Sequence, residues 1–143
     1  MRGRPRLVLD TNVVVSAVLW QGTPGRLIAL AGDKAVQLFT SRALLEELAA
    51  TLTKKKLVKS VAATGLTAEH MLSSYRRITT LVTARQLERQ VSRDADDDAV
   101  LACALAARVD FIVTGDADLL VLDAFCNICI ATPAKALKMM DAD

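Results

Sequence analysis

Four aspartates lie at the start of an apolar run, where they could either cap a helix or take part in a reaction. The apolar run is AVLACALAA, and the acids before it are Asp94, Asp96, Asp97 and Asp98. Acids favour helix N-termini, and Asp94 with Asp97 three residues later resembles a capping box, so capping could explain two of the four. Residues three or four apart share a helix side, which places Asp97 beside Leu101 and predicts that it points toward the sheet edge rather than into water.

Single acids also end two strand-like runs. Asp10 closes RLVL, and Asp116 follows Thr114-Gly115 after FIV. In open parallel sheets, ligands bind outside the carboxyl ends of the strands, so we expect Asp10 and Asp116 on one edge, where Asp97 could meet them. A further candidate lies in RALLEELAATL, where Glu47 is nearer the leucine stripe than Glu46. We favour Glu47 as the inward carboxylate, although spacing separates the two weakly.

Clustered carboxylates restrict the chemistry. Two bare carboxylates about 4 Å apart repel by roughly 4 kcal/mol at an effective dielectric near 20, so they must bind protons, be separated by water, or share a divalent cation. Oxygen ligands without Cys or His favour Mg²⁺ or Mn²⁺. Other catalysts have little support, since the one histidine, His70, lies in an amphipathic stretch, no base accompanies a serine or cysteine, and no glycine-rich phosphate loop is present.

Strand-like and helix-like segments alternate along the chain. Strands are expected at 6–10, 35–40, 81–83, 111–114 and 128–131, and helices from about 12 to 19 and at 25–31, 42–52, 65–78, 96–108, 118–122 and 133–140. Alternation of this kind predicts an α/β fold with a mainly parallel central sheet covered by helices on both faces. Gly22 and Pro24 are expected to break the first helical stretch, and Ser41 is expected to cap the helix after it.

Length and composition fit one domain, 1–143, in a chain of 143 residues with 52% apolar residues. Asp10 interrupts the N-terminal apolar run, and no uncharged stretch reaches the roughly 18 residues of a spanning helix, so we expect a soluble cytoplasmic protein with no membrane partner. The Cys126–Cys129 pair is interpreted as two thiols in or beside a strand, and Cys103 as a core residue.

The charge is small overall and uneven along the chain. The net charge is +2, with +3 over residues 1–41, +6 over 42–93 and −7 over 94–143. A basic part beside an acidic pocket suits a polyanionic substrate whose reacting phosphate is held by metal. Solvation of helices is the alternative explanation for most of these cations.

Taken together, these motifs resemble the PIN-domain proteins. The resemblance rests on LVLDTNVVVSAVL, SRALLEEL and RDADDDAVLACALAARVDFIVTGDADLL, which occur in the family's order and cover the chain from Arg6 to about Leu137. More narrowly, the chain is similar to VapC, the toxin component of toxin–antitoxin pairs. The resemblance implies a three-layer α/β/α fold and a Mg²⁺- or Mn²⁺-dependent endoribonuclease that hydrolyses RNA phosphodiester bonds with metal-activated water.

Site residues carry over by position. Asp10, Asp97 and Asp116 match the metal-site aspartates, and Glu47 matches a helix glutamate that supports metal or water. Matches to polar groups that orient the acids are Thr11, Asn12, Asp94, Thr114 and Asp118. Glu46 in place of Glu47, or Asp98 in place of Asp97, stays open. Candidate phosphate-binding cations are Arg42, Arg85, Arg89 and Arg93.

The resemblance also implies an RNA substrate, an antitoxin protein as partner and a homodimer. The alternative is a catalytically silent protein of the same fold that binds RNA or an antitoxin. A receiver-like signalling domain fits poorly, because it expects an adjacent acidic pair after the first strand, whereas Asp10 stands alone. The RNA target and the number of metal ions stay open.

Overall fold

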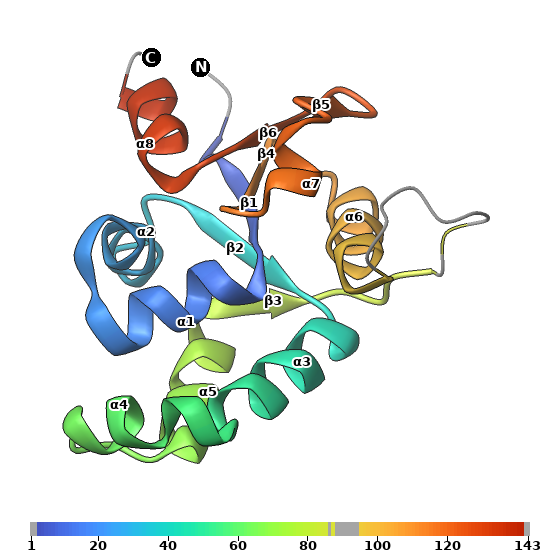
Figure 1. Cartoon of the computed structure of the whole chain (residues 1–143). Helices are drawn as coiled ribbons and strands as arrows, with labels where there is room; N and C mark the ends of the chain where they lie inside the picture. The colour runs from blue at the N-terminus through green and yellow to red at the C-terminus, as the bar shows by residue number, and fades with distance from the viewer. Residues whose placement is uncertain (1–2, 86, 88–94, 142–143) are drawn as a thin grey trace.

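A six-stranded sheet forms the centre of the molecule (Figure 1). The computed structural model describes residues 3–85, 87 and 95–141, with the backbone alone for 95 and 96. The strands lie in the order β3-β2-β1-β4-β6-β5, and all neighbours are parallel except β5 and β6. Their bounds are β1 (Arg6–Leu9), β2 (Gln37–Thr40), β3 (Thr79–Leu81), β4 (Phe111–Val113), β5 (Ala124–Phe125) and β6 (Ile128–Ala131).

Helices cover both faces of this sheet, which makes three layers (Figure 1). One face packs against the helices α1 (Thr11–Trp20), α2 (Gly22–Gly32), α3 (Arg42–Leu52), α5 (Ala68–Ile78) and α8 (Pro133–Asp141). The other face packs against α6 (Ala95–Ala107) and α7 (Ala117–Leu120). A 3₁₀ turn, η1 (Lys55–Leu57), and α4 (Val58–Ala63) connect α3 to α5. The expected α/β/α architecture with a mainly parallel sheet is confirmed.

The central strand β1 shows why the sheet is buried on both sides. Its side chains alternate, with Leu7 and Leu9 in the apolar cluster under α1 and α2 and Val8 in the cluster under α6. None of the three is more than 2% exposed. Parallel strands covered on both faces are therefore apolar throughout, and polar side chains become possible where the strand ends.

Several element boundaries differ from the sequence expectations. The break between α1 and α2 lies at Gln21, whose φ is 59°, and α2 already begins at Gly22. Pro24 falls in the first turn of α2, where its missing amide costs no hydrogen bond. The edge strand β3 begins at Thr79 rather than residue 81. The helix α4 and the strand β5 were not expected.

The two-residue strand β5 forms a hairpin with β6. Cys126 and Asn127 make its turn, both with positive φ (50° and 67°). Cys126 is exposed in this turn and Cys129 lies within β6, as expected for two thiols in or beside a strand, and Cys103 is buried, as expected for a core residue. His70 is exposed on α5. No single helix in the described ranges is long and apolar enough to cross a membrane, and α1 and α2 reach that length and composition only when taken together across a bend of 94°.

Candidate metal centre

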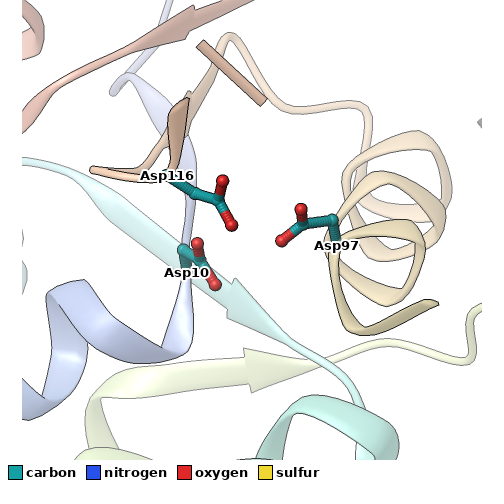
Figure 2. Close-up of side chains that lie close together, drawn as sticks. All are labelled: Asp10, Asp97 and Asp116. Carbon is teal, nitrogen blue, oxygen red and sulfur yellow. The ribbon is translucent and has the colours of Figure 1, made fainter. Parts of the chain in front are cut away.

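Three carboxylates from distant parts of the chain converge at one edge of the sheet. Asp10, Asp97 and Asp116 each offer one oxygen, and these oxygens all lie within 4.8 Å of one another. Figure 2 shows the three side chains turned toward a common point. Asp10 and Asp97 are buried, at 6% and 3% exposure, and Asp116 is half-buried. We call this group the acidic triad.

Asp10 is held at the junction of β1 and α1. Its amide donates to the carbonyl of Val113 in β4 at 2.9 Å, which continues the ladder past the end of β1. Its Oδ1 accepts from the amide of Thr11 at 2.8 Å, so the side chain caps α1. A site acid thereby gains a rigid position, because the strand fixes its backbone and the helix start fixes its carboxylate.

Thr114 links two members of the acidic triad. This fully buried residue follows β4, and its amide donates to Ala131 in β6 at 2.9 Å. Its hydroxyl donates to Asp10 Oδ2 at 2.7 Å and accepts from the Asp116 amide at 3.0 Å. The expectation that Thr114 orients the acids agrees with these contacts.

Asp116 is fixed by its own helix as well. Its Oδ1 accepts from the amide of Asp118 at 2.8 Å and caps the short helix α7. The expected role of Asp118 as an orienting acid is therefore performed by its backbone, while its side chain is exposed.

The third member, Asp97, depends on the placement of α6. This helix buries Val100, Leu101, Cys103 and Ala104 against the sheet. At its far end the Arg6 guanidinium lies 4.3 Å from the Phe39 ring centroid and donates to the carbonyl of Ala107 at 2.6 Å. A cation that binds the last carbonyls of a helix stabilises that end. This role of Arg6 could not be predicted from the sequence, because it depends on a contact between residues that are 101 positions apart.

Burial distinguishes Asp97 from Asp98, the two neighbouring candidates on α6. Asp97 is buried within the acidic triad, whereas Asp98 is half-buried and outside that group of described residues. On α3, Glu47 is half-buried and Glu46 is exposed, which agrees with Glu47 as the inward residue. Glu47 lies outside the group of three.

Of the remaining orienting residues, Thr11 acts through its amide, and its buried hydroxyl has no hydrogen-bond partner in the described ranges. Asn12 is exposed, so its side chain is in solvent, unlike the two buried carboxylates of the acidic triad. Asp94, expected as the cap of α6, lies outside the described residues, as do Arg89 and Arg93.

The acidic triad fits a hard divalent cation. Carboxylates less than 5 Å apart repel by roughly 3 kcal/mol per pair at an effective dielectric near 20, and a cation between them reverses the sign of that interaction. All three ligands are oxygens, as Mg²⁺ and Mn²⁺ prefer. Asp116 is the least buried of the three carboxylates, so the cluster is most accessible to solvent at this residue.

The family assignment follows from comparison with known proteins. The family model of the PIN domain matches residues 6–118, most of the chain and all three members of the acidic triad. This chain belongs to the PIN-domain family. An uncharacterized protein of Methanocaldococcus jannaschii is 27% identical over 118 residues, which cover 82% of this chain and 74% of the relative.

A solved structure supports the same fold. A chain in the crystal structure of VapBC2 from Rickettsia felis, bound to a DNA fragment from their promoter, superposes with a TM-score of 0.58. The match covers 87% of this PIN domain and 96% of that chain, at 16% identity. At that identity the likeness concerns the fold.

Proposed function

We propose that this PIN domain is a Mg²⁺- or Mn²⁺-dependent endoribonuclease. The observation that carries the proposal is the acidic triad, in which three oxygens within 4.8 Å come from the ends of β1 and β4 and the start of α6. Family membership adds support, since nuclease chemistry is what the motifs imply. Asp10, Asp97 and Asp116 would hold the ion. When bound, the ion lowers the pKa of water and offsets charge on phosphate oxygens.

The protein's own residues would set the geometry of hydrolysis. Thr114 holds Asp10 and Asp116 in register, so the ligand oxygens are positioned before substrate arrives. We assign Glu47 to accept the proton of the attacking water at a carboxylate oxygen, with support from its half-buried position beside the exposed Glu46. Arg42 and Arg85 are exposed candidates for contacts with substrate phosphates.

We further propose that the protein acts in the cytoplasm as the toxin of a toxin–antitoxin pair, as a homodimer neutralised by an antitoxin protein. The VapBC2 likeness and the motif resemblance support this. The alternative remains a catalytically silent protein that binds RNA or an antitoxin. Catalysis is the property that separates the two proposals.

The deciding experiment is RNA cleavage by purified protein with Mn²⁺ or Mg²⁺, with chelator, and with Asp97→Asn. We expect cleavage that requires the ion and falls at least about 10²-fold in the variant, because one ligand charge is lost from a buried site. Asp33→Asn is the matched control, since Asp33 is an exposed acid at the end of α2.

Cleavage that survives Asp97→Asn would place the chemistry elsewhere. A protein that binds Mn²⁺ by calorimetry but cleaves none of a panel of structured and unstructured RNAs would favour the silent binding protein.

A further inference from the structure

A cationic surface lies near the end of α1 that is remote from the acidic triad. It is formed by α1, α2, η1 and α4. Residues 11–32 and 48–68 contain no Asp or Glu. They do contain five cations, all exposed, which are Arg26, Lys54, Lys55, Lys56 and Lys59. Within the described ranges, none of the five lies within 4.0 Å of a carboxylate oxygen. Less than a third of a chain whose net charge is only +2 thus carries five cations and no acid.

The protein's single tryptophan lies on this surface. Trp20 ends α1, is 58% exposed and lines a hollow of about 470 Å³ with Lys59, Ala63 and Leu66. A second hollow, lined by Arg26, shares Val18, Gln21 and Leu66 with the first, so the two are neighbours. An exposed indole is a large apolar surface that folding has left in water. Here it shares a hollow with Lys59, where a base could stack on the indole while a phosphate meets the ammonium group.

The surface is connected to the acidic triad by a rigid element. Asp10 caps the start of α1 and Trp20 ends it, so ten residues at 1.5 Å each separate the two by about 15 Å. Figure 1 shows α1 running from the end of β1 toward α2 and α4. A strand bound at Trp20 could therefore reach the triad along α1.

We propose that Trp20 and the lysines of η1 and α4 form an accessory binding surface for single-stranded RNA, which holds the substrate beside the acidic triad. The proposal rests on the proposed ribonuclease function for its choice of polyanion. A protein partner fits less well, because protein interfaces are depleted in lysine, whereas four lysines within six positions suit phosphates. The triad itself repels phosphate until an ion is bound, so cations elsewhere must supply the attraction for RNA.

The test uses the fluorescence of Trp20, the only tryptophan in the chain. Oligouridine of about 12 nucleotides, within the usual size range of single-stranded sites, is added in chelator so that cleavage does not interfere. We expect quenching that weakens with salt. In Lys54→Gln/Lys55→Gln/Lys56→Gln/Lys59→Gln the affinity should fall at least about tenfold, and the negative slope of log affinity against log salt should become shallower by about 3.

Lys138→Gln, an exposed lysine on α8, is the matched control and should bind as the parent does. Trp20→Ala, followed by anisotropy of labelled oligouridine, should also weaken binding. The proposal is overturned if oligouridine leaves the fluorescence unchanged, if the four-lysine variant binds like the parent, or if polyglutamate of equal charge binds as tightly. None of these binding results decides whether the protein cleaves RNA with a metal ion. The accessory surface can therefore be refuted while the proposed ribonuclease function stands.

Discussion

At the scale of single residues, the bridging hydroxyl of Thr114 is the contact that holds two site acids together. Thr114→Val keeps the shape and removes the hydroxyl, so Asp10 Oδ2 and the Asp116 amide both lose this partner. We expect the free energy of unfolding to fall by about 1–3 kcal/mol and Mn²⁺ affinity to fall with it. Urea unfolding and calorimetry measure the two effects.

Thr114→Ser tests whether the hydroxyl is the cause. Serine can make both hydrogen bonds, so it should recover most of the Mn²⁺ affinity. If Thr114→Val binds Mn²⁺ as tightly as the parent, the hydroxyl is dispensable and its bridging role is refuted.

Two adjacent glutamates on α3 provide a matched pair. Glu47 is half-buried and Glu46 is exposed. Glu47→Gln should therefore lower kcat for RNA cleavage by about 10²-fold, which is the usual size of a proton-transfer contribution. Glu46→Gln should change kcat less than twofold. A pH–rate profile adds a second readout, because loss of a general base removes its ionisation from the profile. Equal effects in the two variants would disprove the assignment.

The positions of the three site acids could be predicted from the sequence, but the contacts that support them could not. Asp10, Asp97 and Asp116 could be predicted because strand ends and helix periodicity determine where a residue points. The bridge through Thr114 depends on distances of 2.7 and 3.0 Å that no spacing rule contains. The exposed position of Asn12 shows the same limit, since a motif match carries no information on side-chain exposure.

At the scale of elements, α3, α5 and α6 meet at buried ionisable groups. Burial raises the pKa of the Cys103 thiol on α6 from 9.0 to about 12, against a smaller opposite effect of its hydrogen bond with Ser41. Burial, together with the nearby Cys103, also raises the pKa of Tyr75 on α5 well above 10.0. Both groups are thus neutral in the folded protein at every physiological pH, which suits their place in the core.

These shifts predict a loss of stability at alkaline pH. Above pH 9 the unfolded chain loses the thiol proton and above pH 10 the phenol proton, while the folded protein keeps both. The free energy of unfolding therefore has its full value below pH 9. At higher pH it should fall by about 1 kcal/mol per pH unit for each of the two groups, up to about pH 12. Urea midpoints across that range measure the slope, and Cys103→Ala should reduce it. An unchanged slope in that variant would contradict the prediction.

The elements themselves were predictable to different degrees. Strands with apolar runs and helices with caps were placed within a few residues, because periodicity and Ser41 or Thr67 mark them. The strand β5 was missed because two residues carry no periodicity, and its turn uses Cys126 and Asn127 where glycine would give a signal. The start of α2 was misplaced because Pro24 ends a helix when it is interior and is tolerated in the first turn.

At the scale of the whole molecule, the acidic triad couples ion binding to folding. The three acids come from positions 10, 97 and 116, so the unfolded chain does not bring them together. At an ion concentration 100 times Kd, binding to the folded state alone adds about 2.7 kcal/mol, which should raise Tm by roughly 5–10 °C in a domain of this size. Calorimetric scans with Mn²⁺ and with chelator measure the shift.

Asp10→Asn should abolish most of that increase in Tm, and Asp33→Asn should leave it intact. Sodium chloride at matched ionic strength controls for screening. An equal Mn²⁺ effect in Asp10→Asn would mean that the ion binds outside the triad.

The position of β1 in the sheet also bears on synthesis of the chain. This strand is made first, yet its partner β4 pairs Val8 with Ile112, 104 residues later. At about 5–20 residues per second, β1 waits roughly 5–20 s on the ribosome with one edge open. Asp116 emerges later still, so the nascent chain cannot assemble its three acids until residues 10–116 have all been made. Synthesis of β4 and the residues after it, rather than of β1, would then set the moment at which each new molecule can bind the ion.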